Sequence, residues 1–184
     1  LLSGTRNRPP SGVVERIRTQ LTHLDDDTLY YRGRDARDLA RTATFEEIAE
    51  LLWQSPWPDR PADEKIAASA RAFCGDRARD IDRIRIVVDL LGAQDVLRHR
   101  IDPASVSAAA ALIIGTAVAA VGTPGPHPGT TVAERLWPRL TAESASVQRI
   151  SLLNAALVLL ADHDLSAGTV AARVAASARG SIYA

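Results

Sequence analysis

The apolar positions of the chain recur at two different spacings, and the change falls near Asp35. Residues 16–32 alternate weakly between apolar and polar side chains, and the acidic run 25–27 interrupts them. Alternation around an acidic turn predicts a short β-hairpin. After Asp35 the apolar residues recur every three or four positions, which is the period of one helix face. We therefore predict an all-α, multi-helix fold with one short N-terminal β-hairpin.

Start and stop signals divide the helical part into segments. Ser, Thr and Asp accept hydrogen bonds from the first helical amides, and Thr-x-x-Glu forms a capping box. Pro suits a first helical position, while Gly and Pro end helices. The predicted helix starts are Thr44, Pro61, Asp80, Asp102, Thr131, residue 146 and Ser166. The predicted ends are Pro56, Gly75, Gly92, Val121, Pro138, residue 160 and the end of the chain.

The N-terminal residues differ in composition from the rest of the chain. Residues 1–15 contain Gly4, Pro9, Pro10 and Gly12 and few apolar side chains. Such a stretch predicts an extended lead-in or linker. The remaining residues, 16–184, are enough for one sizeable domain or for an incomplete part of a larger one.

Charge and cysteine content exclude several classes of function. Lys and Arg total 22 and Asp and Glu total 22, and aromatic residues make up only 4% of the chain. A chain without a basic surplus or stacking aromatics does not fit nucleic-acid binding. The single cysteine, Cys74, excludes an internal disulfide and a zinc site built on paired cysteines. We expect Cys74 to be a small buried helix residue.

One predicted helix is apolar on all sides. The segment Val106–Val121 consists mostly of alanine and is shorter than the roughly 20 residues that cross a membrane. A buried helix is the better interpretation, and its small side chains let other helices approach closely. A helix that is apolar all round must be covered on all sides. We expect a second protomer to cover part of it, with burial inside one protomer as the alternative.

A histidine stands between two carboxylates at the junction of the last two predicted helices. Residues 161–166 read Ala-Asp-His-Asp-Leu-Ser, so His163 lies just before a helix start. Free N–H groups at a helix start attract anions, and adjacent carboxylates favour the imidazolium form. His163 is therefore a candidate ligand for a small carboxylate. An ordinary polar corner between two helices is the alternative.

Two long motifs resemble bacterial citrate synthases, including 2-methylcitrate synthases. Residues 29–40, LYYRGRDARDLA, resemble the Tyr-Arg-Gly signature of that family, and residues 44–53, TFEEIAELLW, resemble the helix that follows it. Residues 160–177, LADHDLSAGTVAARVAAS, resemble its Ala-Asp-His-Glu segment. The motifs occur in the order of the family, and the resemblance covers about residues 16–184. Some actinobacterial relatives carry an N-terminal helix-turn-helix domain, which residues 1–15 would follow.

The resemblance implies part of a citrate synthase large domain, all-α with an N-terminal hairpin. It implies condensation of acetyl-CoA, or a related acyl-CoA, with oxaloacetate, without a metal or a cofactor apart from the acyl-CoA substrate. It also implies that His163 binds oxaloacetate. We expect a cytoplasmic homodimer that contacts its copy through helices including 103–121 and 146–160, with no nucleic-acid or membrane partner.

The chain also departs from the family pattern. The Gly-Pro-Leu-His-Gly-Gly-Ala motif of the enol-stabilising histidine is not in the sequence, and His23, His99 and His127 match no family histidine. The other catalytic residues, the oxaloacetate-binding arginines and the CoA site belong to later parts of the family sequence. The resemblance thus implies no catalytic residue in this chain. Asp164 and Ser166 replace the usual Glu and Asn, which bears on oxaloacetate affinity.

Three hypotheses remain open at this point. The chain is the N-terminal part of a longer citrate synthase-type large domain, or half of a split enzyme whose partner chain supplies the catalytic residues. In the third hypothesis it is a non-catalytic module that binds a dicarboxylate or mediates dimerisation. Without the closing helices of the domain, apolar faces such as that of Leu152, Leu153, Leu157 and Leu160 are uncovered. We therefore expect the 184 residues to dimerise strictly or to aggregate.

Overall fold

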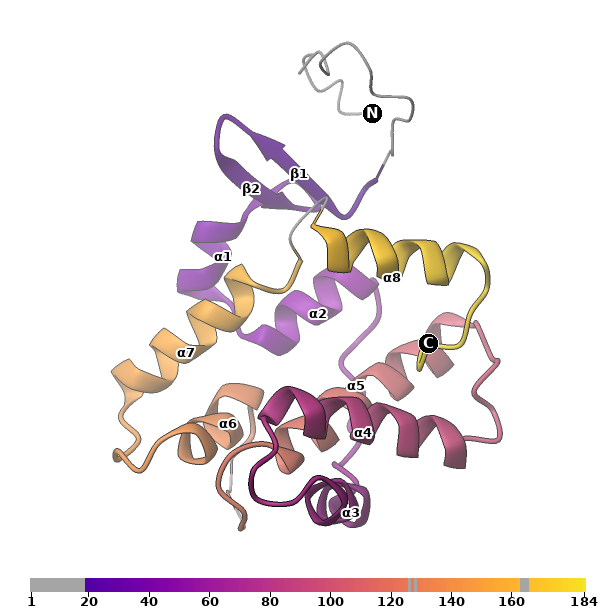
Figure 1. The fold of residues 1–184 in the computed structure, drawn as a ribbon. Coiled ribbons are helices and arrows are strands. Elements are labelled where there is room, and N and C mark those ends of the chain that lie inside the picture. Colours follow the sequence, from indigo (N-terminus) through magenta and orange to yellow (C-terminus); the bar gives the residue numbers. More distant parts are fainter. Residues whose placement is uncertain (1–18, 126, 128, 163–165) are drawn as a thin grey trace.

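The computed structural model describes residues 19–125, 127, 129–162 and 166–184, which form a helical array with a small sheet at one end (Figure 1). The strands are β1 (Thr22–Asp25), β2 (Thr28–Tyr31) and β3 (Arg34–Asp35). The helices are α1 (Ala36–Thr42), α2 (Phe45–Trp53), α3 (Glu64–Cys74), α4 (Asp80–Gln94), α5 (Pro103–Ala120), α6 (Val132–Leu140), α7 (Val147–Leu159) and α8 (Ala167–Ser177). The predicted all-α fold with an N-terminal hairpin is confirmed.

The sheet contains one strand more than the predicted hairpin. β1 and β2 pair antiparallel, and their turn residues Asp26 and Asp27 both have positive φ, at 41° and 62°. Gly33, with φ 82°, then turns the chain back so that the two-residue strand β3 pairs with β2. A strand of two residues is too short to produce an alternating pattern in the sequence.

The larger core lies among α3, α4 and α5. Ile66, Val87, Leu91 and Ala120 are its buried members from these three helices. α5 is long and apolar enough to cross a membrane by length and composition alone, but it packs against α3, α4 and α6. The prediction of a buried helix is thus confirmed for the sides of α5 that contact α3, α4 and α6.

A second core joins the sheet to α1, α2 and α7. Tyr31, Leu39, Ile48 and Val158 are each at most 2% exposed and pack together. In Figure 1, α7 runs beside α1, although their sequences are more than 100 residues apart. This cluster brings the end of α7 against β2.

Both capping boxes and most helix starts are confirmed, but several boundaries were predicted wrongly. α3 begins after Asp63 rather than at Pro61, because the Asp63 carboxylate accepts a hydrogen bond from the Ile66 amide. α4 continues past Gly92 to Gln94, and α6 contains Pro138 in its last turn.

Two further expectations near chain or helix ends also need correction. α8 ends at Ser177, because residues 178–184 form turns. Cys74 is the last residue of α3 and is only partly buried, since it lies at a helix end rather than on the core face.

Candidate functional site

The predicted site falls at the corner between α7 and α8. The structure describes both ends of this corner, Asp162 and Ser166, whereas His163, Asp164 and Leu165 lie outside the described residues. The site is therefore built here from the groups that hold the two ends.

Tyr31 on β2 holds the end of α7. Its side chain is fully buried, and its hydroxyl lies 3.0 Å from the Val158 carbonyl, 3.1 Å from the Leu159 carbonyl and 3.3 Å from the Asp162 carbonyl. The last carbonyls of a helix lack their usual i+4 amide partners, and this hydroxyl gives them a side-chain donor; the Val158 carbonyl also accepts from the Ala161 amide at 3.2 Å. Burial raises the pKa of the Tyr31 phenol, which keeps it a donor at neutral pH.

The Asp162 carboxylate ties the corner to α8. Its Oδ2 lies 3.1 Å from Nη2 of Arg173, and its Oδ1 accepts a hydrogen bond of 3.1 Å from the Thr169 hydroxyl. The two charged side chains are only 14% and 22% exposed, so solvent screens this ion pair less than a surface pair. Arg173 Nη2 also donates to the Thr22 hydroxyl on β1, at 3.2 Å. Sheet, corner and last helix thus meet at one guanidinium.

The first turn of α8 begins directly after the residues outside the description. The Ser166 hydroxyl accepts a hydrogen bond of 3.3 Å from the Thr169 amide, as an N-cap does. The predicted cap is confirmed, and the corner therefore precedes a helix N-terminus. A helix N-terminus presents unpaired amides and a partial positive charge to a nearby anion.

The Asp162 carboxylate has a cation beside it within the described corner. It is paired with Arg173, which offsets its charge and reduces its effect on neighbouring groups. The expectation that both flanking carboxylates favour the charged form of His163 concerns a residue outside the described residues and stays a prediction. Nη1 of Arg173 is buried without a hydrogen-bond partner in the described part of the chain. The corner thus combines an unused N–H donor with a helix N-terminus, which suits a carboxylate ligand.

The other three histidines and the acidic residues form no second site of this kind in the part of the chain that the structure describes. His23 lies on β1 with its ring 6.2 Å from that of Tyr30, His99 is exposed, and the His127 ring lies 3.2 Å from the Thr123 carbonyl. Within the described ranges no three His, Cys, Asp or Glu residues gather where they would hold a metal ion.

Sequence reasoning did not assign roles to Tyr31, Thr169 or Arg173. All three stand inside the motifs quoted above, yet a motif letter does not show which atoms meet. A buried tyrosine needs a partner for its hydroxyl. This rule is the one signal in the sequence that could have indicated a polar contact of Tyr31, and it does not say which residue accepts the hydrogen bond.

Comparisons with known proteins give the family of the chain. The family model described as citrate synthase, C-terminal domain, matches residues 12–184. Citrate synthase 2 of Bacillus subtilis is 27% identical over 203 residues, covering 97% of this chain and 54% of that protein. A 2-methylcitrate synthase of Mycobacterium tuberculosis is 29% identical over 184 residues, covering 85% of this chain and 45% of that protein.

Solved structures show the same fold. The chain superposes on citrate synthase from Thermoplasma acidophilum, solved in a ternary complex with carboxymethyl coenzyme A and oxaloacetate, with a TM-score of 0.73 at 21% identity. Citrate synthase from Thermotoga maritima gives a TM-score of 0.64 at 22% identity. Each match covers 92% of this chain and 51% of the other. The chain thus spans about half the length of the relatives it matches.

Proposed function

The chain belongs to the citrate synthase family, and we propose that it serves a citrate synthase-type condensation of an acyl-CoA with oxaloacetate. Within that activity, the part we assign to these 184 residues is to hold oxaloacetate at the α7–α8 corner through His163. Acetyl-CoA or a related acyl-CoA is the second substrate, and we expect no metal or further cofactor.

One contact carries this proposal. The Tyr31 hydroxyl lies 3.3 Å from the Asp162 carbonyl, and this pair joins the two motifs that resemble the family most. The motifs stand 131 positions apart in the sequence. Their meeting just before the N-terminus of α8 supports a specific, structurally fixed position for His163 rather than an ordinary turn between helices.

The chemistry expected of this corner is recognition and polarisation. A protonated imidazole and nearby α8 amides would hold a carboxylate of oxaloacetate through charge-assisted hydrogen bonds. The Asp162–Arg173 pair would keep the chain on either side of His163 in place. We expect no condensation by the 184 residues alone, because the motif of the enol-stabilising histidine is not among them.

Oxaloacetate binding tests this role directly. Isothermal titration calorimetry of the wild-type chain is expected to show oxaloacetate binding, and His163→Gln is expected to weaken it at least tenfold, the equivalent of about 1.4 kcal/mol. His99→Gln makes the same chemical change on an exposed loop and serves as the matched control. Binding that is absent from the wild type, or equal in both variants, would contradict the proposal.

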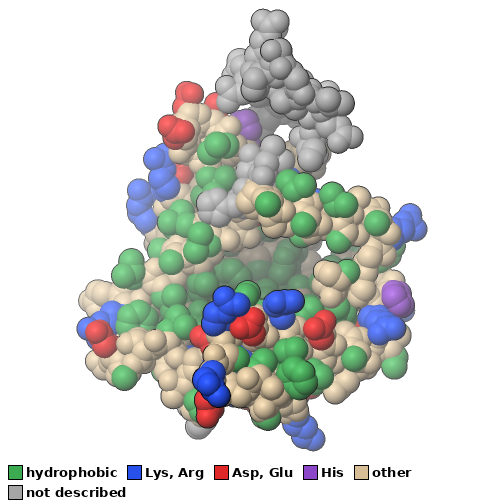
Figure 2. Space-filling model, in the orientation of Figure 1, with side chains coloured by type: hydrophobic (Ala, Val, Ile, Leu, Met, Phe, Trp, Pro, Cys, Tyr) green, Lys and Arg blue, Asp and Glu red, His purple; other side chains and the backbone are tan. Residues whose placement is uncertain are grey.

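A homodimer is the assembly we infer. Leu152 on α7 is 71% exposed and Leu160, the residue after α7, is 67% exposed, and Figure 2 shows hydrophobic side chains on the surface of α7 and α8. Exposed apolar patches on this scale mark interaction surfaces. We infer contact with a second copy through helices that include α5 and α7, and a cytoplasmic location, which the single cysteine supports.

A further inference from the structure

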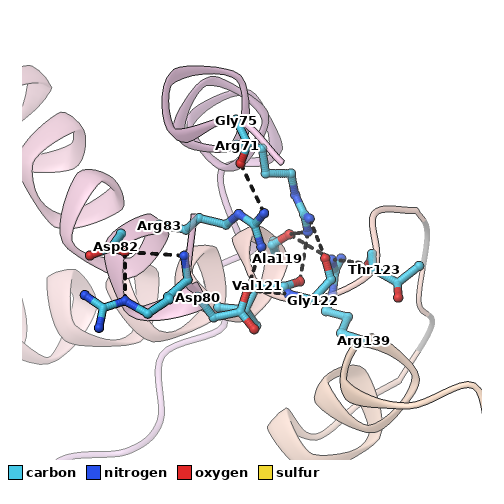
Figure 3. Close-up of polar contacts among 11 residues, drawn as sticks. Arg71, Gly75, Asp80, Asp82, Arg83, Ala119, Val121, Gly122, Thr123 and Arg139 are labelled. Carbon is cyan, nitrogen blue, oxygen red and sulfur yellow. Dashed lines mark hydrogen bonds and ion pairs between the residues drawn. The ribbon is translucent and has the colours of Figure 1, made fainter. Parts of the chain in front are cut away.

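Two arginines from different helices meet at the C-terminal end of α5 (Figure 3). Nη1 of Arg71, on α3, donates to the Gly122 carbonyl at 2.9 Å. Nη1 of Arg139, on α6, donates to the Ala119 carbonyl at 2.8 Å, and its Nη2 donates to the Gly125 carbonyl at 3.2 Å. Nη2 of Arg71 also donates to the Ala119 carbonyl, so one oxygen joins both guanidinium groups. The two positive charges therefore lie close together.

Neither charge has an ionic partner in the described part of the chain. Among the described residues, no carboxylate lies within the 4.0 Å of an ion pair from either guanidinium. Asp80, the acid at the start of α4, pairs instead with Arg83 at 2.7 Å. Arg139 is only 6% exposed, and its Nε is buried without a hydrogen-bond partner in the described ranges. Buried charges in proteins are normally paired directly, whereas Asp80 and Glu64 act on these two arginines only without an ion pair.

Burial and like charge both act against these cations. Burial lowers the pKa of Arg71, and the neighbouring charges of Arg139 and Arg83 lower it further, while Asp80 and Glu64 act in the opposite direction. Burial also lowers the pKa of Arg139, while Glu64 acts in the opposite direction. Arginine stays protonated in proteins, so the cost appears as an unfavourable field rather than as a lost proton. An anion placed between the two groups would offset it.

A cavity lies beside these arginines. Its volume is about 460 Å³, and its walls include Glu64, Ala67, Ala68 and Pro124 together with Arg71 and Arg139. This volume falls in the range of small-molecule sites, which combine apolar walls with a few placed polar groups. Each guanidinium has five N–H donors, and the carbonyls of the α5 end take three hydrogen bonds from each one. Donors remain for a ligand.

We propose that this cavity binds the oxyanion group of a small molecule, a phosphate or a carboxylate, against Arg71 and Arg139. The bound group supplies the direct ion pair that the two guanidinium groups do not make with any described carboxylate, and the alanine and proline walls accommodate a small apolar portion. This proposal does not depend on the proposed function.

Ala68 offers a test that leaves both arginines in place. It is an exposed residue of α3 on the cavity wall, so larger side chains are tolerated there. Inorganic phosphate is titrated by calorimetry at constant ionic strength. Ala68→Glu introduces a competing carboxylate and is expected to weaken phosphate binding about tenfold, a local charge effect. Ala68→Gln, with the same shape and no charge, is the matched control and is expected to bind within about threefold of the wild type.

Glu64 gives a change of the opposite sign. Glu64 is a wall residue of the cavity and its charge acts on both arginines, so Glu64→Gln is expected to tighten phosphate binding about threefold to tenfold. Glu143→Gln makes the same change on a distant surface loop and is expected to leave the affinity unchanged. A purely structural role of the arginines in capping α5 gives no reason for Glu64→Gln to improve anion binding.

Parallel titrations with acetate distinguish phosphate from carboxylate ligands. Binding of either anion supports the proposal if it weakens in Ala68→Glu and tightens in Glu64→Gln. No binding of either anion, or binding that these two variants leave unchanged, overturns it.

Discussion

Tyr31 connects two parts of the chain that the sequence keeps far apart. Its ring belongs to the buried cluster with Leu39 and Val158, and its hydroxyl serves the carbonyls at the end of α7. The same residue therefore contributes apolar burial and a polar contact. Loss of the hydroxyl alone separates the two contributions.

Tyr31→Phe is expected to lower the free energy of unfolding by about 1 kcal/mol, because buried carbonyls lose a donor while the ring stays in place. Urea denaturation followed by circular dichroism measures this change. Tyr30→Phe is the matched control, because Tyr30 is the next residue on β2 and points to the opposite face of the sheet. An equal effect of the two variants would contradict the role given to the Tyr31 hydroxyl.

Tyr183 gives the molecule a dependence on alkaline pH. Its hydroxyl donates to the Asp95 carboxylate at 3.0 Å, and burial, this hydrogen bond and the Asp95 charge raise its pKa to about 12. The folded state then holds the proton more tightly than the unfolded state, where the pKa is about 10. The resulting stability is fully present below pH 10 and is lost as the pH rises toward 12.

We therefore expect the free energy of unfolding to fall more between about pH 9 and pH 11 in the wild-type chain than in the Tyr183→Phe variant. Tyr31 also has a raised pKa and remains in the variant, so part of the loss persists. Tyr30→Phe should follow the wild type. If all three proteins lose the same amount in urea denaturation, Tyr183 does not carry this dependence.

At the scale of single residues, the sequence predicted identities better than contacts. It identified Asp162 and Ser166 as the ends of a corner and Ser166 as a cap. It could not pair Asp162 with Arg173, because eleven positions and a helix start separate them and any nearby arginine fits equally well. Residue patterns indicate which group needs a partner, whereas the fold decides which partner it has.

Among the elements, α4 shows how tertiary packing overrides a local signal. Gly92 was predicted to end this helix, yet α4 continues to Gln94. A Cβ at position 92 would lie 2.9 Å from the Cβ of Tyr183 and 3.0 Å from its Cγ. The glycine therefore makes room for the C-terminal residues rather than stopping the helix.

A double-mutant cycle tests this interpretation. Gly92→Ala is expected to destabilise the wild type, because the new methyl group overlaps Tyr183. In the Tyr183→Gly background the same change should stabilise by about 0.5–1 kcal/mol, the usual advantage of Ala over Gly inside a helix. Urea denaturation measures all four proteins.

Gly168→Ala provides the control for helix propensity. Gly168 lies in α8, and a Cβ there would have no atom within 4 Å. This change should stabilise both backgrounds by a similar amount of about 0.5–1 kcal/mol. A stabilising Gly92→Ala in the presence of Tyr183 would show that the glycine is not required for this contact.

Helix starts were predicted well where one side chain determines them. Thr44 and Thr131 make their capping boxes because hydroxyl, amide and carboxylate lie within a single turn. The predicted start at Pro61 was wrong because Asp63, two residues later, caps the helix with its side chain. Helix ends depend more on distant packing, which explains the errors at Gly92 and Pro138.

On the scale of the whole molecule, exposed apolar side chains occur on several elements, and one group of them lies on its last two helices. Val147, Leu152, Leu160 and Val174 are 60–79% exposed on or next to α7 and α8. Leu153 and Leu157 of the same predicted face are partly buried instead. The expectation of an uncovered face is thus confirmed for Leu152 and Leu160.

Leu152→Glu is expected to convert the chain to a monomer or to suppress its aggregation, because a buried carboxylate would oppose association. Analytical ultracentrifugation over a range of concentrations measures the assembly. Leu97→Glu changes a residue that is 56% exposed outside α7 and α8 and should leave the assembly as it is. A wild-type chain that is a soluble, cooperatively folding monomer at every concentration would contradict this prediction.

At this scale the fold class followed from the sequence, whereas the cavity at the α5 end did not. Arg71 and Arg139 come from separate helices and meet only when both pack against α5. Neither belongs to a recognisable motif, so no local pattern marked them.

The central claim is that the corner between α7 and α8 presents His163 to oxaloacetate. The chain has four histidines, so a heteronuclear NMR spectrum of selectively labelled imidazoles gives few signals, and His163→Gln identifies the one of interest. On addition of oxaloacetate we predict that the His163 signal shifts in a saturable manner while those of His23, His99 and His127 stay in place. An unchanged His163 signal, at oxaloacetate concentrations where calorimetry shows binding, would contradict the account.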